Sequence, residues 1–214
     1  NVMNKFVGII DLGLSNLHNV KLACKKVGLK SKFVVRKNDF KNCDKIILPG
    51  VGSFKVAMKR LKSLDLEKNL KIMIKDQIPL LGICLGMQLL FSSSTEQGKS
   101  KGLNVFKGKV LKFKFKKNKF NRFSVPHVGW NYIKQSANRR NYILKGLKKY
   151  EYMYFVHSFY VNSEDKKIIT SSTSYGDKLF CSSVNKGNIF ACQFHPERSG
   201  EQGLKIYKNF KDLN

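Results

Sequence analysis

Acidic residues are scarce in this sequence. Its 214 residues include 41 Lys and Arg but only 14 Asp and Glu, which leaves a formal net charge of +27. Such an excess attracts anions in general without selecting one of them. Most of the positive charge is lysine spread along the whole chain, whereas specific nucleic-acid readout favours arginine and a localised basic stripe. The composition therefore predicts a lysine-rich surface, and specific nucleic-acid binding is not expected.

Long apolar segments and paired cysteines are also missing. Every apolar stretch stops well short of the ~18 residues that a membrane-spanning helix needs, and the first residues lack the apolar core of a signal peptide. The five cysteines form no C-x-x-C pair and no even disulfide set, which indicates a reducing compartment. With only 4 Pro and 42% hydrophobic residues, the chain is neither collagen-like nor disordered. We expect a soluble, cytoplasmic protein with a single domain over residues 1–214.

The first half of the chain alternates short apolar runs with helical patterns. Strands are predicted at residues 6–11, 32–35, 45–48 and 79–83. Helices are predicted at 16–27, 54–62, 65–76 and 85–90. This alternation is typical of a mostly parallel sheet covered by helices on both faces, whose sites lie at the carboxyl ends of the strands. Asp11, the 49–54 loop and Cys84 all fall at such ends.

The second half changes to a period of two. Further strands are predicted at 109–115, 128–133, 152–157, 167–170, 179–183 and 188–194, and a final helix at 201–212. Ser92 to Thr95 is interpreted as a polar helix end. The alternation at 112–116 places Phe113 and Phe115 on one face and Lys112, Lys114 and Lys116 on the other. That pattern favours a half-buried strand over a stacking platform for single-stranded nucleic acid.

A turn with glycine on both sides of a cysteine lies at Gly82-Ile-Cys84-Leu-Gly86. This is the thiol form of the G-x-S-x-G nucleophile elbow, in which glycines allow a sharp turn that exposes the nucleophile at the sheet edge. The N-terminus of the following helix favours a thiolate and offers backbone N–H groups to an oxyanion. Taken alone, the motif is also compatible with glycines that pack around an inert cysteine.

His195-Pro-Glu197 follows a predicted strand far along the chain from that cysteine. A nucleophilic cysteine needs a base, and the base needs an acceptor that orients it. With one residue between them in an extended segment, His195 and Glu197 can project to the same side. Glu197 then holds one imidazole nitrogen and leaves the other for Cys84. An isolated His-Pro-Glu is more often an ordinary loop, but its combination with a cysteine elbow favours an active site.

A third element, Pro49-Gly50-Val51-Gly52, lies at the carboxyl end of another predicted strand. Its two glycines leave the main chain free to present an N–H to a developing negative charge. Donors of this kind contribute ~10²–10³ in rate where they have been measured. By itself the segment is an ordinary turn between a strand and a helix.

The segment from Gly82 to Gln88, taken with His195-Pro-Glu197, resembles the triad-type (class I) glutamine amidotransferases, and the resemblance runs nearly end to end. It implies an α/β, flavodoxin-like fold with a mixed central sheet flanked by helices, and it implies no metal and no organic cofactor. Within the family, four more segments look like the glutaminase subunits of imidazole glycerol phosphate synthases: residues 48–54, 126–131, 154–160 and 193–199.

The resemblance implies a role for each matching residue. Cys84 attacks the side-chain amide of L-glutamine, His195 takes the thiol proton and then protonates the departing ammonia, and Glu197 orients His195. The oxyanion would meet the backbone N–H of Leu85 and one N–H from the loop of Gly50, Val51 and Gly52, which in this family reorients before it works. The glutamine would be held by Gln88, Glu96, Ser158 and Phe159, the last two through their main chain.

The resemblance also implies a partner. Family members of this kind pass ammonia to a (β/α)₈ cyclase subunit in a heterodimer, which forms imidazole glycerol phosphate and an aminoimidazole carboxamide ribotide in histidine biosynthesis. The positions that match partner-facing segments are Asn16, Pro126, His127, Val128, Gly129, Trp130 and Arg198. Trp130 is the single Trp, and an aromatic residue flanked by glycine suits a docking surface better than a core position.

Two alternatives remain open at the level of sequence. The first loop, residues 11–17, departs from the usual family pattern at two positions, so a paralogous glutaminase that feeds another amidotransferase, such as a sugar-modifying one, is a competing interpretation. The net charge of +27 also allows a nucleic-acid-binding protein on an inactive amidotransferase scaffold. The intact Cys84, His195 and Glu197 argue against that second alternative.

Overall fold

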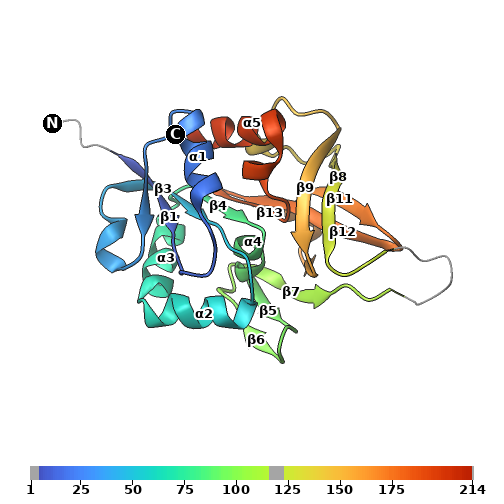
Figure 1. The fold of residues 1–214 in the computed structure, drawn as a ribbon, viewed down its shortest axis with the longest axis horizontal. Coiled ribbons are helices and arrows are strands. Elements are labelled where there is room, and N and C mark those ends of the chain that lie inside the picture. The colour runs from blue at the N-terminus through green and yellow to red at the C-terminus, as the bar shows by residue number, and fades with distance from the viewer. Residues whose placement is uncertain (1–4, 116–122, 214) are drawn as a thin grey trace.

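The structure is a computed structural model that describes residues 5–115 and 123–213 (Figure 1). Lys116, at the end of the alternating lysine and phenylalanine run, lies outside these residues. The helices are α1 (His18–Lys26), α2 (Phe54–Ser63), α3 (Leu66–Lys75), α4 (Leu85–Leu89) and α5 (Gly200–Lys211). The strands are β1 (Phe6–Ile10), β2 (Ser31–Val34), β3 (Cys43–Leu48), β4 (Leu80–Ile83), β5 (Phe91–Ser94), β6 (Ser100–Lys101), β7 (Phe106–Lys112), β8 (His127–Gln135), β9 (Tyr150–His157), β10 (Phe159–Ser163), β11 (Ile169–Tyr175), β12 (Lys178–Lys186) and β13 (Ile189–Cys192). Short 3₁₀ turns lie at Lys37–Phe40, Tyr142–Leu144, Lys166–Ile168 and Pro196–Arg198.

The central sheet is mixed. Its order is β2-β1-β3-β4-β13-β12-β11-β8-β9, and the first five of these strands run parallel. The other four pair antiparallel. The parallel half has the order of a flavodoxin-like sheet, in which ligands bind at the carboxyl ends of the strands. The two halves meet at β13, so the strand before His195 lies directly beside the strand before Cys84.

Helices cover both faces of the parallel half, as the alternating pattern predicted. Figure 1 shows α1 and α5 on one side of the sheet and α2 and α3 on the other. The α1 and α5 side buries Val20, Ala23, Ile206 and Phe210 against β1 and β4, and the opposite side buries a second core around Phe54, Leu61 and Leu70. Continuous apolar strands such as β4, buried along its whole length, need this cover on two faces.

A second, four-stranded sheet has the order β10-β7-β5-β6. It includes residues 91–94, so the interpretation of Ser92 to Thr95 as a polar helix end is wrong. Helix α4 ends at Leu89, and β5 pairs with β6 and β7. The Ser92 hydroxyl donates to the Phe106 carbonyl (3.2 Å). A short polar side chain that disfavours a helix interior thus forms a hydrogen bond between strands β5 and β7.

Two of the predicted strands begin and end at other residues than expected. Strand β7 ends at Lys112, and the strand predicted from residue 167 begins at Ile169 because a 3₁₀ turn precedes it. Phe113 nevertheless is buried, and its ring stacks on that of Phe115 with 5.7 Å between centroids. Lys112 and Lys114 are exposed, so the run is a half-buried structural segment over the described residues.

In the described part of the chain, none of the helices has the length and apolar character needed to cross a bilayer.

Candidate active site

Cys84 occupies a strained turn between β4 and α4. Its backbone has φ 52° and ψ −109°, a conformation that non-glycine residues rarely adopt. Gly86 makes the turn possible, because a Cβ at this position would lie 1.7 Å from the Leu48 carbonyl oxygen. The elbow therefore requires the glycine that the sequence pattern singled out, and it places the sulfur at the carboxyl end of the sheet.

A cavity of about 440 Å³ opens beside the sulfur. It brings together residues that are far apart in the sequence, namely Val51, Gly52, Ser53, Cys84, Leu85, Gln88, Glu96, Pro126, Val156, His157, Ser158 and Phe159. All four residues predicted to hold glutamine line it. Free glutamine is a small polar molecule, and the wall contains an acidic side chain, an amide and hydroxyl groups that suit its charged and amide ends.

His195 and Glu197 meet as the sequence predicted, although by a different local geometry. His195 Nδ1 lies 2.7 Å from Glu197 Oε1. The segment is not extended: Pro196–Arg198 forms a 3₁₀ turn that brings the carboxylate back to the ring. The turn is secured by Ser199, whose hydroxyl donates to the His195 carbonyl at 2.7 Å and accepts from the Tyr154 N–H at 3.0 Å.

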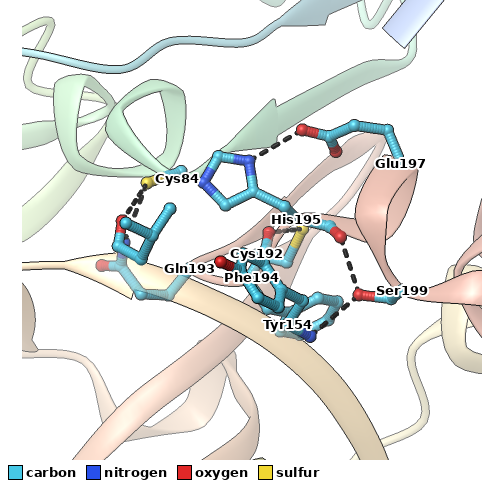
Figure 2. A network of polar contacts seen from close by, with 9 residues as sticks. Cys84, Tyr154, Cys192, Gln193, Phe194, His195, Glu197 and Ser199 are labelled. Carbon is cyan, nitrogen blue, oxygen red and sulfur yellow. Dashed lines mark hydrogen bonds and ion pairs between the residues drawn. The ribbon is translucent and has the colours of Figure 1, made fainter. Parts of the chain in front are cut away.

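Figure 2 shows the His195 ring between the side chains of Cys84 and Glu197. Nδ1 faces the carboxylate, and Nε2, on the other side of the ring, has no hydrogen-bond partner among the described residues. Burial by itself lowers the pKa of His195, but the Cys84 sulfur and then the Glu197 carboxylate oppose burial and raise the pKa to about 10. The Cys84 sulfur and the Glu197 carboxylate therefore both favour the imidazolium form of His195.

The predicted oxyanion site is not assembled in this structure. The Leu85 N–H, one of its two expected donors, donates to the Gly50 carbonyl at 3.3 Å. The loop thus presents an acceptor where a donor is needed. Gly52 has φ 101° with no atom within 4 Å of its missing Cβ, and Val51 is 40% exposed, so the loop has space to adopt another conformation.

The residues predicted to hold glutamine already have partners inside the protein. Glu96 Oε2 accepts the Phe54 N–H at the start of α2 (2.8 Å). Gln88 Nε2 donates to the Phe159 carbonyl at 3.0 Å. The Ser158 carbonyl accepts the Phe113 N–H at 3.0 Å.

Most of the predicted partner-facing residues are at the surface. Trp130 is 55% exposed and Val128 56%, so the single Trp is not a core residue. The Arg198 guanidinium lies 4.4 Å from the centre of the Tyr154 ring, beside Trp130, and Asn16 and Pro126 are exposed. His127 is the exception: it is buried, and its side chain contacts His157 inside the protein. The expectation that His127 itself faces a partner is wrong, because alternate residues of β8 point to opposite faces.

Sequence reasoning missed one residue that contacts the Cys84 sulfur. Gln193 is fully buried, and its Nε2 lies 3.6 Å from Cys84 Sγ while its Oε1 accepts from Gln88 (3.1 Å). The sequence offered one signal for Gln193, its position two residues before His195.

The other four cysteines are also free; burial raises the pKa of Cys24 and of Cys181 to about 12, so these thiols are inert. Over residues 5–115 and 123–213, no three His, Cys, Asp or Glu side chains gather as a metal site.

Comparison with known proteins identifies the family. The family model described as "Glutamine amidotransferase class-I" matches residues 8–213. A crystal structure of a glutamine amidotransferase is 19% identical with a TM-score of 0.72, over 95% of this chain and 96% of that one. Thermotoga maritima PurLQS is 18% identical with a TM-score of 0.73, over 98% and 99%. The chain belongs to the class-I glutamine amidotransferase family, and it is an enzyme of that class.

Curated relatives give its place within the family. The imidazole glycerol phosphate synthase subunit HisH of Caldanaerobacter subterraneus subsp. tengcongensis is 45% identical over 97% of this chain and 98% of the relative. The subunit of the same name from Methanocaldococcus jannaschii is 44% identical over 97% and 99%. The chain groups with these HisH subunits, which confirms the resemblance, the fold class and the enzyme class predicted from the sequence.

Proposed function

We propose that this chain hydrolyses L-glutamine to glutamate and ammonia through Cys84, His195 and Glu197, and delivers the ammonia to a (β/α)₈ cyclase subunit in histidine biosynthesis. The observation that carries the chemistry is the buried arrangement of the sulfur, the imidazole and the carboxylate beside a cavity of about 440 Å³. The relatives named as subunits of imidazole glycerol phosphate synthase support the pathway. The five free thiols support a reducing, cytoplasmic setting.

The first step is thioester formation. The Cys84 thiolate attacks the side-chain carbonyl carbon of glutamine, with its proton on His195 Nε2. The tetrahedral intermediate collapses as the carbon–nitrogen bond breaks, and His195 gives the proton to the leaving nitrogen, which departs as ammonia. Water, activated by the same imidazole, then attacks the thioester and releases glutamate. The raised pKa of His195, about 10, suits the initial ion pair with the thiolate.

This chemistry also requires a change in the loop before the oxyanion can form. A tetrahedral oxyanion next to Leu85 would face the Gly50 carbonyl, which is repulsive and leaves the Leu85 N–H occupied. Rotation of the peptide after Gly50 replaces this carbonyl with an N–H and frees the Leu85 donor. We infer that the isolated chain is a slow glutaminase and that partner docking favours the rotated loop. Each donor gained in this way is worth ~10²–10³ in rate.

The proposed docking surface is the exposed face of β8 and β9 with Arg198. Val128 and Trp130 on β8 lie opposite Val156 and Tyr154 on β9, and the Arg198 guanidinium covers Tyr154. Pro126, at the start of this face, also lines the cavity beside Cys84. A partner seated here would therefore close the mouth of the cavity and receive ammonia without its release to solvent.

The test is glutamate release from glutamine by the purified chain, alone and with the histidine-pathway cyclase of the same organism and its ribonucleotide substrate. Cys84→Ala serves as the blank, and we expect it to lower turnover by about 10⁶-fold because nucleophile and base act as a unit. Strong stimulation by the cyclase that disappears in the blank supports the proposal. Turnover that does not change when this cyclase is added would support the glutaminase activity but favour the paralogous interpretation. Full turnover by Cys84→Ala would overturn the mechanism.

A further inference from the structure

A chain of hydrogen bonds runs from the docking strand β8 into the pocket. His127 Nδ1 lies 2.9 Å from His157 Nε2, and His157 Nδ1 lies 2.7 Å from the Phe159 carbonyl oxygen. At the outer end, Asn131 Nδ2 lies 3.3 Å from His127 Nε2. We call Asn131, His127 and His157 the histidine relay.

The hydrogen-bond partners determine which ring nitrogen of each histidine in the relay carries the hydrogen. The Phe159 carbonyl can only accept, so His157 carries its hydrogen on Nδ1. The Nε2 atom of a neutral His157 then accepts from His127 Nδ1–H, which leaves His127 Nε2 to accept from Asn131. The amide orientation of Asn131 is supported independently, because its Oδ1 accepts the Tyr132 N–H (2.7 Å) and its Nδ2 also donates to the Ser174 carbonyl (3.0 Å). Both imidazoles are therefore uncharged and locked in one tautomer.

The inner end of the relay reaches the nucleophile. The Phe159 carbonyl accepts from His157 and also from Gln88, and Gln88 donates a second time to Gln193 (3.1 Å). Gln193 in turn donates to the Cys84 sulfur (3.6 Å). Each of these side chains is buried, so an unmade bond at one place cannot be replaced by bulk water.

The outer end of the relay shares a strand with the docking surface. His127 and Asn131 lie on the inner face of β8, whereas Val128 and Trp130 between them point outward. The ring of His127 is held between those of Tyr175 and Phe155, with 3.9 Å and 5.0 Å between centroids. A side chain packed on two sides and bonded at both nitrogens has one position relative to its strand.

We propose that His127 is a positioning residue of the glutamine site: acting through His157, it fixes the Phe159 carbonyl and the Gln88 amide in the pocket that binds glutamine. The inference rests on the proposed function. Burial lowers the pKa of His127 to about 4 and that of His157 to about 3, so the relay stays neutral where the enzyme works. The neutral state also avoids a second positive charge near His195.

The test uses the binding of glutamine and does not depend on turnover. Cys84 is alkylated with iodoacetamide at pH 7 with increasing glutamine, and the modified thiol is located by peptide mass. His127→Phe keeps a ring between Tyr175 and Phe155 but removes both hydrogen bonds. His127→Asn keeps a donor close to the position of Nδ1. His18→Gln, at an exposed histidine outside the relay, is the matched control.

We expect the glutamine concentration for half-protection to rise about tenfold in His127→Phe, the effect of one unsatisfied buried acceptor. In His127→Asn it should stay within about threefold of wild type, and in His18→Gln it should not change. Equal protection of wild type and His127→Phe would overturn the positioning role alone, as would a loss in His127→Asn as large as in His127→Phe. Failure of glutamine to protect the wild type would overturn the proposed function and this inference with it.

Imidazole ¹⁵N spectra of the wild type at pH 7 give a second readout that needs no variant. We expect both His127 and His157 as neutral rings with the hydrogen on Nδ1, which is the less common tautomer of free histidine. An Nε2–H tautomer or an imidazolium at either residue would overturn the relay, whatever the stability of the variants.

Discussion

The buried histidines form two groups that differ in charge: His195, which faces Cys84, and the pair of His127 and His157, of which His157 lines the pocket. His195 is 4% exposed, and His127 and His157 are 3% and 6% exposed. Burial favours the neutral imidazole in each case. His195 lies between a sulfur and a carboxylate, and its pKa is raised to about 10. His127 and His157 face each other, and their pKa values fall to about 4 and about 3. The anionic partner, and not the depth of burial, decides whether a histidine here is an acid–base group or a fixed hydrogen-bonding group.

The strongest way to break this contrast is to remove the carboxylate charge. In Glu197→Gln the side chain keeps its shape, but His195 loses its anionic partner and its preferred tautomer. We expect turnover of glutamine, measured with the cyclase partner, to fall by about 10⁴-fold. Glu201→Gln, at an exposed carboxylate one turn further on, should retain wild-type turnover. A Glu197→Gln enzyme with near-normal turnover would contradict the role of the carboxylate.

The sulfur supplies the other half of the contrast. In Cys84→Ser a neutral hydroxyl replaces a group that stabilises the imidazolium. Burial, which lowers the pKa of His195, is then opposed by Glu197 alone. The pKa of His195 should therefore fall from about 10 toward the values of the other two histidines. An NMR titration of the His195 ring in both proteins measures the change. An unchanged pKa in the serine variant would show that Glu197 alone holds the proton.

The loss of stability at acidic pH tests whether His127 and His157 are neutral in the folded protein. The folded pKa values of His127 and His157 lie below the ~6.5 of an unfolded histidine. As the pH falls, the unfolded chain therefore binds protons first, and the stability that the pair contributes above pH ~6.5 is lost as the pH drops toward about 4 and 3. Urea unfolding from pH 7 to pH 4 should show a smaller loss in His127→Phe than in wild type or His18→Gln. Parallel pH profiles would contradict the neutral assignment.

The smallest expected effect concerns a buried group beside Glu197. Burial and then the Glu197 charge raise the pKa of Tyr207, and the Tyr207 hydroxyl has no hydrogen-bond partner within the described residues. Tyr207→Phe removes this desolvated hydroxyl. We expect the free energy of unfolding to rise by about 1 kcal/mol, measured by urea unfolding, with turnover unchanged. A loss of stability would mean that the hydroxyl is satisfied in solution, for instance by a buried water.

Local patterns predicted the elements well where one segment contains its own signal. The Gly82 to Gly86 elbow was recognisable because the sharp turn needs glycine at fixed offsets from Cys84. The contact of His195 with Glu197 was also predicted, although the structure forms it through a 3₁₀ turn and not an extended segment. Strand β5 was missed, because Ser92 and its neighbours have no strong preference of their own and adopt a strand only when β6 and β7 pair with them.

By itself the sequence determined the chemistry of this protein: a cysteine elbow, a histidine with its carboxylate, and the alternation of strands and helices that brings both to one edge of a sheet. Only the tertiary structure decided that the Leu85 donor is occupied by Gly50, that Gln193 contacts the sulfur, and that His127 turns inward to His157. The reason is the separation along the chain. Periodicity and turn geometry are properties of a few consecutive residues, whereas each of these contacts joins segments that are tens of residues apart and exists only once the sheet has formed.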